Sequence, residues 1–391
     1  MSVVMPIFNI IYSLGLFMGI GGSVLYSSEK GRRENGCCNE FFSTALLGTA
    51  ALAAIAWTGI VFFGEPLLRL FGAEQTLLPL TKAYLFPIKI VIPVFVFNQM
   101  LAAFLRNDNA PGLATAAVLG GGIFNVFGDY FFVFAMDMGI LGAGLATAAG
   151  ACITLLIMLT HFFSKRCTLK FVSIHYLFIK VKGILTTGFS TFFVDLAVGI
   201  MTMLFNRQIV RYLGTDALSV YGLIVNISMF VQCCAYSVGQ ASQPIFSINY
   251  GAEHWGRMKE TLKYALGTVA FFGIFWTTLV VLVPNGFVRI FMKPTEAVLQ
   301  IAPSIMRCYG ISFLLLPLNI FSTYYFQSLM KPAASFVVSV GRGLVISGAL
   351  IMLLPTVAKA DFIWFSMPVT EIVIAVFVIY MMVRYTKRLA K

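Results

Sequence analysis

Long apolar runs recur along the whole chain and are separated by short polar stretches. A helix needs roughly 20 apolar residues to cross a hydrocarbon core about 30 Å thick, and these runs are long enough. They lack the alternation of apolar and polar positions that marks the strands of a membrane β-barrel. We therefore expect eleven membrane-spanning helices, over residues 4–27, 41–63, 83–105, 113–135, 144–164, 184–211, 217–241, 262–283, 301–327, 334–355 and 362–383.

Composition places the chain in the same class. Of its 391 residues, 59% are hydrophobic and 11% are charged, and the mean hydropathy is +0.91. These values lie outside the range of soluble globular domains, and a single signal peptide cannot produce apolar runs along the whole length. The sequence predicts an all-α polytopic membrane protein that has the lipid bilayer as a partner.

The 27 Lys and Arg residues are dispersed among short loops, whereas a nucleic-acid-binding surface would gather them on one face. No nucleic-acid partner is expected, and the positive-inside rule explains the excess of positive charge better. One set of alternate loops holds seventeen basic residues and the other holds seven, with none between residues 136 and 143. This asymmetry predicts a cytoplasmic C-terminus, and eleven crossings then place the N-terminus outside. The seventeen are Lys30, Arg32, Arg33, Arg106, Lys165, Arg166, Lys170, Lys180, Lys182, Arg257, Lys259, Lys263, Lys331, Arg384, Lys387, Arg388 and Lys391.

Several positions of the first half recur about 220 residues later, which indicates an internal repeat. Pro111 and Pro332 continue the series at an offset of 221. A repeated unit with an even number of helices keeps its orientation, so two six-helix units would be parallel repeats about an axis along the membrane normal. The matching pairs are Gly19 and Gly239, Gly31 and Gly251, Ala45 and Ala265, Leu46 and Leu266, Arg69 and Arg289, and Phe71 and Phe291.

The repeat predicts two pseudo-symmetric bundles joined by a connector. We expect an N-terminal lobe of five helices over residues 1–165, an interfacial helix over the connector 166–182, and a C-terminal lobe of six helices over 183–391. Two units of 220 residues exceed the chain length, and helix 184–211 has no counterpart in the first half. The first repeat is therefore expected to lack one helix, either because the start is set too late or because the chain is naturally truncated.

No enzymatic motif is present, since HExxH, GxSxG and the P-loop pattern are all absent. The cysteines form no CxxC pair, and neither a disulfide nor zinc is indicated. The three histidines lie near expected cytoplasmic helix ends or loops, where a solvated or interfacial role is favoured over catalysis. They are His161, His175 and His254. The chain is not expected to be an enzyme or to hold a cofactor.

An aspartate lies inside the apolar segment GGGIFNVFGDYFFVFAM, within the predicted membrane-spanning helix 113–135. A charged Asp at such a position costs roughly 2.5 to 3.5 kcal/mol, so these residues usually face a protein interior or a water-filled cavity and mark ion paths. Asn125 precedes Asp129 by four residues and shares its helix face. Asp129 is our candidate for binding a coupling ion. The alternative is a protonated carboxyl that hydrogen-bonds a neighbouring helix and has no role in transport.

Two longer segments resemble the signature regions of the multidrug and toxic compound extrusion (MATE) transporters. They are LRNDNAPGLATAAVLGGGIFNVFGDYFFVFAMDMGILGAGLATAAG and GQASQPIFSINYGA. The resemblance covers the whole chain from what would be the family's second helix, and it is nearest to the bacterial and archaeal DinF-like branch. It implies a twelve-helix, two-lobe antiporter that exports organic, often cationic compounds in exchange for H⁺ or Na⁺.

The resemblance also implies an ion site in the N-terminal lobe. The matching positions are Asn125, Asp129 and Thr147, whose oxygens suit Na⁺. The family pattern adds an Asp from the first helix, which this chain does not contain. By the repeat, Asn206 stands where the missing helix would carry that Asp, and its neutral side chain predicts that the C-terminal lobe lacks an equivalent ion site.

Other embedded polar residues are candidates for the substrate cavity or for structural pairs. For Asp195, near the start of the expected helix 184–211, and for Glu371, both roles stay open, and Asn206 joins them as a cavity candidate. For Lys89 and Arg342 we favour snorkelling or an ion pair between helices.

The sequence therefore predicts a secondary antiporter that works by alternating access in a prokaryotic cell membrane. Its partners would be a small organic substrate and H⁺ or Na⁺, and the protein would be a monomer. One alternative is a flippase for lipid-linked precursors of the same superfamily, which would need a more cationic cavity to hold a pyrophosphate. Another is a degenerate, truncated membrane protein that does not transport.

Overall fold

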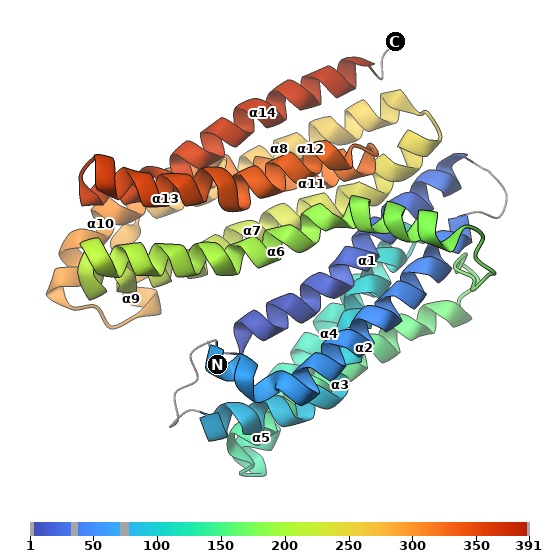
Figure 1. Cartoon of the computed structure of the whole chain (residues 1–391), viewed down its shortest axis with the longest axis horizontal. Helices are drawn as coiled ribbons and strands as arrows, with labels where there is room; N and C mark the ends of the chain where they lie inside the picture. Colours follow the sequence, from blue (N-terminus) through green and yellow to red (C-terminus); the bar gives the residue numbers. More distant parts are fainter. Residues whose placement is uncertain (1–3, 33–37, 71–77, 389–391) are drawn as a thin grey trace. The chain divides into compact units, whose positions relative to one another are not determined.

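A computed structural model describes residues 4–32, 38–70 and 78–388, and within these ranges it is helical with no strand (Figure 1). Arg33, Phe71 and Lys391, used in the sequence analysis, lie outside the described residues. The first five α-helices are α1 (Met5–Arg32), α2 (Cys38–Leu70), α3 (Leu78–Asn107), α4 (Pro111–Asp129) and α5 (Gly139–Leu159), with the π-helix η1 (Tyr130–Ala135) after α4 and the 3-10 helix η2 (Thr160–Phe163) after α5.

The remaining helices include several broken spans, in which a short π or 3-10 segment interrupts an α-helix. They are α6 (Leu177–Tyr212), α7 (Gly214–Gly251), α8 (Trp255–Leu282), α9 (Pro284–Phe291), α10 (Glu296–Gly310), η3 (Ile311–Leu314), α11 (Leu316–Ser328), α12 (Pro332–Val340), η4 (Gly341–Val345), α13 (Ile346–Val357), η5 (Ala360–Phe365) and α14 (Ser366–Arg388). The described part of the chain holds eleven helical spans that are long and apolar enough to cross a membrane, each of 25 to 38 residues. The predicted all-α polytopic fold is confirmed.

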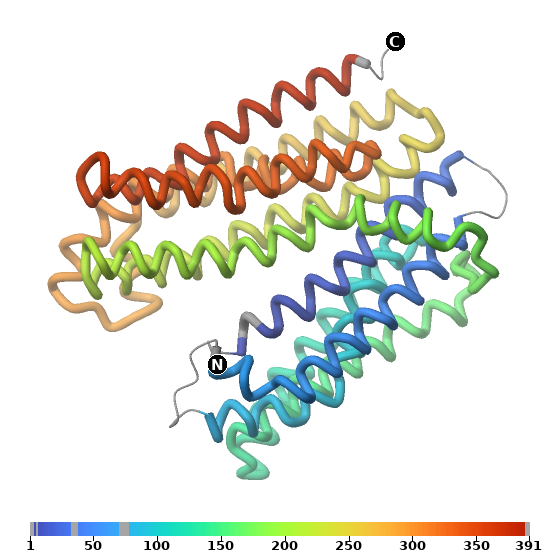
Figure 2. Tube along the Cα trace, in the orientation of Figure 1, coloured from blue at the N-terminus to red at the C-terminus, as the bar shows by residue number. Residues whose placement is uncertain are grey.

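The chain forms two compact units that divide inside α6, with unit 1 ending at Leu196 and unit 2 beginning at Ala197. In unit 1, α1, α2 and α3 run alongside one another (Figure 2). The connector and the first part of α6 belong to unit 1 by their contacts, and so does Asp195, which the sequence analysis assigned to the C-terminal lobe. The predicted lobe bounds, 1–165 and 183–391, stay predictions.

The two units repeat the same hydrogen bond at equivalent positions. In unit 1, the Asn98 amide donates to the carbonyl oxygen of Ala151 over 2.9 Å. In unit 2, the Asn319 amide donates to the carbonyl oxygen of Glu371, also over 2.9 Å. These residues are 221 and 220 positions apart, as the repeat predicts, so each unit joins the same two helices of its bundle in the same way.

Aromatic packing repeats as well. The rings of Tyr26 and Phe104 meet edge to face at 5.8 Å in unit 1. Their equivalents in unit 2, Phe246 and Tyr325, meet edge to face at 5.2 Å. Such pairs stabilise a packed core beyond the burial of their area alone. The repeat is therefore present in the packing of both bundles and not only in the sequence.

The predicted interfacial helix in the connector 166–182 is wrong for most of its length. Residues 164–176 contain no helix, and α6 begins only at Leu177. Within 167–174, Cys167, Leu169, Val172 and Ile174 are at least partly buried, and the other four residues are exposed. The partly buried residues therefore occur in two pairs with a spacing of two residues, which is not the spacing of an amphipathic helix.

Side chains of α2 hold the backbone of this connector. Asn39 donates to the Thr168 carbonyl over 3.2 Å and accepts from the Lys170 amide over 3.0 Å. Ser43 accepts from the Val172 amide over 2.9 Å. These bonds supply partners that a helix would otherwise provide within itself.

Candidate functional site

Glycines allow α4 and α5 to approach closely where the predicted ion site lies. A Cβ atom added to Gly121 would lie 1.9 Å from the Thr154 hydroxyl and 2.6 Å from the Gly150 carbonyl oxygen. One added to Gly128 would lie 3.0 Å from Cβ of Ala146. Larger residues would force the two helices apart, so these glycines bring the polar side chains of both helices together.

Polar side chains of α3, α4 and α5 meet near this contact. The Thr147 hydroxyl on α5 donates to the Ala143 carbonyl over 2.9 Å, so its oxygen is free to accept. The Asn125 amide on α4 donates to it over 3.3 Å, and the Tyr84 hydroxyl on α3 lies 3.3 Å from it. The predicted neighbours Asn125 and Thr147 are therefore in contact. Sequence reasoning missed Tyr84 because an uncharged phenol is not distinctive in a chain so rich in aromatic residues.

Asp129 is the last residue of α4, and the π-helix η1 starts directly after it. Short π segments inside helices occur frequently at functional sites. Oδ1 of Asp129 is buried without a hydrogen-bond partner among the described residues. An unpaired buried oxygen of this kind costs free energy, which favours a bound proton or cation.

The position of Asp129 along its helix matches the predicted bounds. It lies six residues before the end of the span Pro111–Ala135, and the predicted helix 113–135 ends at the same residue. Pro111 starts the helix two residues earlier than expected, and η1 carries the span to Ala135. The shared face with Asn125 is unchanged, since the α-helical spacing holds throughout 111–129.

The three cavity candidates differ in their burial. Asp195 lies half-buried in the middle of α6, because that helix begins at Leu177 and not near residue 184 as expected. Asn206 lies three turns further along the same helix and is exposed. Glu371 is on α14, fully buried.

Glu371 has protein partners for both carboxylate oxygens. Nε of Arg342, in the π-helix η4, lies 2.7 Å from Oε1, and the Asn319 amide donates to Oε2 over 2.6 Å. Arg342 itself is buried, with a side chain 10% exposed. The ion pair favoured for Arg342 is present, and in this conformation Glu371 offers no free oxygen to a substrate.

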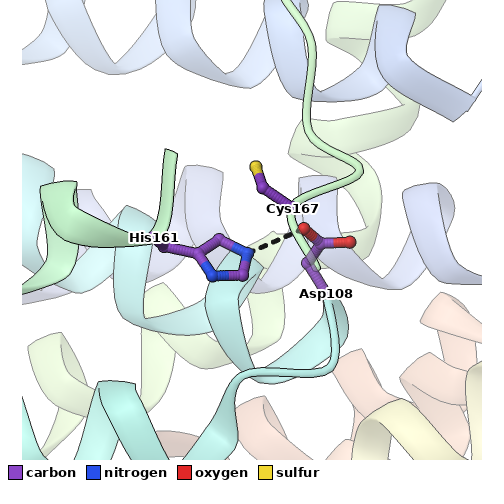
Figure 3. Close-up of side chains that lie close together, drawn as sticks. All are labelled: Asp108, His161 and Cys167. Atoms are coloured by element: carbon purple, nitrogen blue, oxygen red, sulfur yellow. Dashed lines mark hydrogen bonds and ion pairs between the residues drawn. The ribbon is translucent and has the colours of Figure 1, made fainter. Parts of the chain in front are cut away.

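A second buried carboxylate, which sequence reasoning missed, lies in the turn between α3 and α4. Oδ2 of Asp108 is 2.9 Å from Nε2 of His161 and accepts from the Thr168 amide over 2.8 Å (Figure 3). Oδ1 is 2.9 Å from the ammonium of Lys30 and also accepts from the hydroxyls of Tyr26 and Thr168. Of the solvated or interfacial role predicted for His161, the solvated alternative is wrong, because its side chain is 2% exposed and faces this carboxylate.

Asp108 is held ionised by its neighbours. Burial alone would raise the pKa of Asp108, but hydrogen bonds from Thr168, His161 and Lys30 outweigh burial and lower it to about 2. Cys167 completes a group whose ligand atoms lie within 4.8 Å of one another (Figure 3). That spacing could accommodate a metal ion, but the Lys30 ammonium and four other donors already occupy the carboxylate. We interpret the group as the ion-paired anchor of the connector.

Two repeated bundles of membrane-spanning helices, each with polar side chains in its interior, are the arrangement of transporters built from parallel repeats. The sequence profile of the MatE family matches residues 1–131 and 190–351, and the chain belongs to this family. The resemblance seen in the sequence is thereby confirmed at the level of the family. Its assignment to the DinF-like branch and the expected missing first helix stay predictions.

The chain is also similar to curated proteins along most of its length. It is 23% identical over 379 residues to the multidrug export protein MepA of Staphylococcus saprophyticus, covering 96% of this chain and 82% of that protein. It is 22% identical over 368 residues to MepA of Staphylococcus aureus, covering 93% of this chain and 80% of that protein.

Two solved structures share the fold. One is an outward-facing multidrug resistance MATE family transporter of the MOP superfamily, with a TM-score of 0.90 at 19% identity, covering 100% of this chain and 88% of the other. The second is a MOP superfamily transporter from Pyrococcus furiosus, with a TM-score of 0.88 at 19% identity and the same coverage. That transporter is described as having a binding pocket of reverse polarity, which suggests a different function for it.

Proposed function

We propose that the protein is a secondary active antiporter of the DinF-like branch, which exports organic, cationic or drug-like compounds in exchange for H⁺ or Na⁺. Membership of the MatE family and the similarity to proteins named multidrug export proteins support this proposal. The observation that carries it is the buried, unpaired Oδ1 of Asp129, one turn from Asn125. We further propose a monomer in a prokaryotic cell membrane.

Asp129 would exchange its bound ion as the protein alternates between two access states. With H⁺, the carboxyl is neutral while sealed from water and releases its proton when the site opens to a more basic side. With Na⁺, the carboxylate and the oxygens of Asn125 and Thr147 supply the hard ligands that this cation prefers. In both cases the charge at Asp129 changes during the cycle, which couples the ion to transport.

The charges of the embedded side chains favour a cationic substrate. A flippase for a lipid-linked pyrophosphate would need free cationic groups, and the buried Arg342 is neutralised by Glu371 over 2.7 Å. An embedded acid with an unpaired oxygen suits cationic cargo better. The fold alone does not separate these cargoes, since the chain is equally similar to a transporter described as having a binding pocket of reverse polarity.

The test is efflux of a cationic dye from vesicles in which the pH gradient and the Na⁺ gradient are imposed separately. Asp129→Asn keeps the shape of the side chain but removes its charge, so coupled efflux should fall at least about tenfold while the purified protein stays folded. Asn125→Ala should reduce the rate less, because it removes a neutral ligand. Asp137→Asn is the matched control in the exposed loop after η1 and should transport normally. Unchanged efflux and gradient dependence in Asp129→Asn would refute the proposal.

A further inference from the structure

An apolar cavity of about 620 Å³ opens on unit 2, and its walls come from three parts of that unit. This volume lies within the range of about 300 to 1,000 Å³ that is usual for pockets that bind small molecules. One wall is α8, the second is the junction between η3 and α11, and the third is the last two turns of α14. The lining includes Leu262, Ile274, Leu315, Met382 and Lys387.

The cavity exists because the span α10–η3–α11 is broken. The tight 3-10 turn of η3 is followed by Pro317 at the start of α11, which cannot continue the preceding hydrogen-bond pattern. At Gly273 the helix α8 lies directly against this turn, since an added Cβ would be 2.5 Å from the Leu314 carbonyl oxygen. Beyond this contact, α8 and α14 form the two sides of an open groove.

At the equivalent position of unit 1, two aromatic rings lie close together. Phe42 and Phe162 stand 220 residues before Leu262 and Met382, and their ring centroids are 6.2 Å apart. In unit 2 both rings are replaced by smaller or more flexible side chains, and these two side chains line the cavity. The groove is thus a difference between two otherwise repeated bundles.

The length of the groove matches one leaflet of a bilayer. From Leu262 to Ile274 the α8 wall extends about 18 Å, at 1.5 Å per residue. Half of a hydrocarbon core about 30 Å thick is about 15 Å. An acyl chain that enters at the membrane surface would therefore reach the inner end near the midplane.

One end of the groove is basic. Lys387 is part of the lining and is exposed, and Lys263 follows Leu262 on α8 and is exposed as well. The hydroxyl of Thr386, which precedes Lys387 in the lining, is 3.0 Å from the Tyr325 hydroxyl and is engaged with it, so the charge at this end comes from the two lysines. Each basic residue near a membrane surface attracts anionic lipid by about 1 kcal/mol.

We propose that this groove binds one acyl chain of an anionic phospholipid, whose phosphate lies between Lys387 and Lys263. The apolar walls take the chain and the basic end selects the headgroup. The site is separate from Asp129 and does not depend on which compound is exported. It lies at the end of unit 2 that carries the basic loops, and hence in the leaflet that we expect to be cytoplasmic.

The first experiment counts lipids on the protein. The full chain is placed in nanodiscs with equal amounts of phosphatidylglycerol and phosphatidylcholine, and retained lipid is measured by native mass spectrometry. The double variant Leu262→Phe and Met382→Phe, which copies unit 1, should retain about tenfold less phosphatidylglycerol because its rings fill the groove. The control is Leu282→Phe with Met352→Phe, which adds the same rings at exposed positions outside the groove. Equal retention by the filled variant and its control would overturn the proposal.

The headgroup is tested separately. Lys387→Gln should lower the preference for phosphatidylglycerol about fivefold, whereas Lys359→Gln, an exposed lysine outside the groove, should not change it. A preference unchanged by Lys387→Gln would overturn the assignment of the phosphate.

A second measurement needs no variant. A phosphatidylglycerol with a photoreactive group at the end of one acyl chain is crosslinked to the unaltered protein in the same nanodiscs. Crosslinked peptides should come mainly from the inner end of the groove, around Ile274 of α8, Leu315 before α11 and Ile379 of α14. Labelling spread evenly over the exposed apolar residues of all helices would contradict a defined site.

Discussion

Two acids inside membrane spans, Asp129 and Glu371, show how surroundings separate ion exchange from structural pairing. Glu371 is fully buried and both of its oxygens have partners, one of them the cation of Arg342. Among the residues that the structure describes, Oδ1 of Asp129 is buried without such a partner. A paired acid keeps its charge at every step, whereas an unpaired one gains stability from each ion that it binds. This contrast is why the ion site is proposed at Asp129.

The pair of Arg342 and Glu371 gives a prediction for stability. Arg342→Met should lower the free energy of unfolding by about 3 to 5 kcal/mol, because it leaves a carboxylate buried without its cation. Adding Glu371→Gln should restore most of that loss, since the amide oxygen can still accept from Asn319. Unfolding of both variants in detergent micelles would measure the difference. A double variant no more stable than Arg342→Met would show that the pair does not act as a unit.

Asp108 gives a prediction for pH dependence. Its pKa is lowered from 3.8 to about 2 in the folded protein, so its contribution to stability is complete above pH 3.8 and is lost as the pH falls through 2. Asp108→Asn should lower the free energy of unfolding at neutral pH by about 2 to 3 kcal/mol, the value of hydrogen bonds to a charged group.

The check is a set of thermal unfolding curves between pH 7 and pH 2. The variant should lose less stability than the unaltered protein over the acid part of this range, because it no longer carries the carboxylate that must be protonated. Asp361→Asn, an exposed aspartate, is the control and should follow the unaltered curve. Parallel curves for Asp108→Asn and the unaltered protein would contradict the low pKa.

At the scale of elements, the connector depends on side chains of other segments more than on its own helical propensity. Asn39 and Ser43 of α2 bind its backbone, and the Asp108 carboxylate accepts from the amide and hydroxyl of Thr168. Glu40 adds an ion pair with Lys180 and accepts from the His175 amide over 2.8 Å. The segment that enters α6, the helix shared by the two units, is thus held to unit 1.

Removal of one of these side chains should loosen the connector locally. Asn39→Ala deletes two hydrogen bonds, and hydrogen exchange of the Lys170 amide should speed up about five- to tenfold, corresponding to about 1 kcal/mol. Mass spectrometry of peptides that cover 164–176 would detect this change. Thr115→Ala is the control, because that hydroxyl donates to the Pro111 carbonyl in its own helix. If exchange over 164–176 stayed at the unaltered rate, the connector would be held by other means.

At the scale of the whole molecule, the two units share the contacts that pack their helices but differ in their buried charged residues. Asn98 and Asn319 make the same backbone bond, but their partners are Ala151 in unit 1 and Glu371 in unit 2. Gly121, which allows a close helix contact, is replaced by Arg342 at an offset of 221. One unit therefore holds a small-residue contact beside an unpaired acid, and the other holds a neutral ion pair.

The orientation of the whole molecule is predicted from the basic loops. A reporter fused after Lys391, which lies outside the described residues, should be active in the cytoplasm. A second reporter inserted beside Asp137, in the loop between η1 and α5 that has no basic residue, should lie outside. Reporter activities with the reverse pattern would show that the topology is opposite to the predicted one. Equal activity at both positions would mean that the chain inserts in two orientations.

The eleven spans, the repeat and the position of an acid beside Asn125 could all be predicted from the sequence. Apolar length and helical spacing are local properties, so they are present in any window of the chain and need no knowledge of what packs against it. The prediction of a connector helix was wrong because the structure of residues 164–176 is not determined locally. Side chains from α2 supply hydrogen-bond partners for the backbone of this segment.

The partners of the buried charges depended on tertiary structure alone. Asp108 meets His161 from 53 positions away, and Glu371 meets Arg342 and Asn319 from 29 and 52 positions away. Whether a buried acid is paired, and so structural, or unpaired, and so free to bind an ion, follows from these contacts between distant segments. The groove on unit 2 also depends on tertiary structure. Smaller side chains at two positions leave a cavity there because the three surrounding helices do not close over the space.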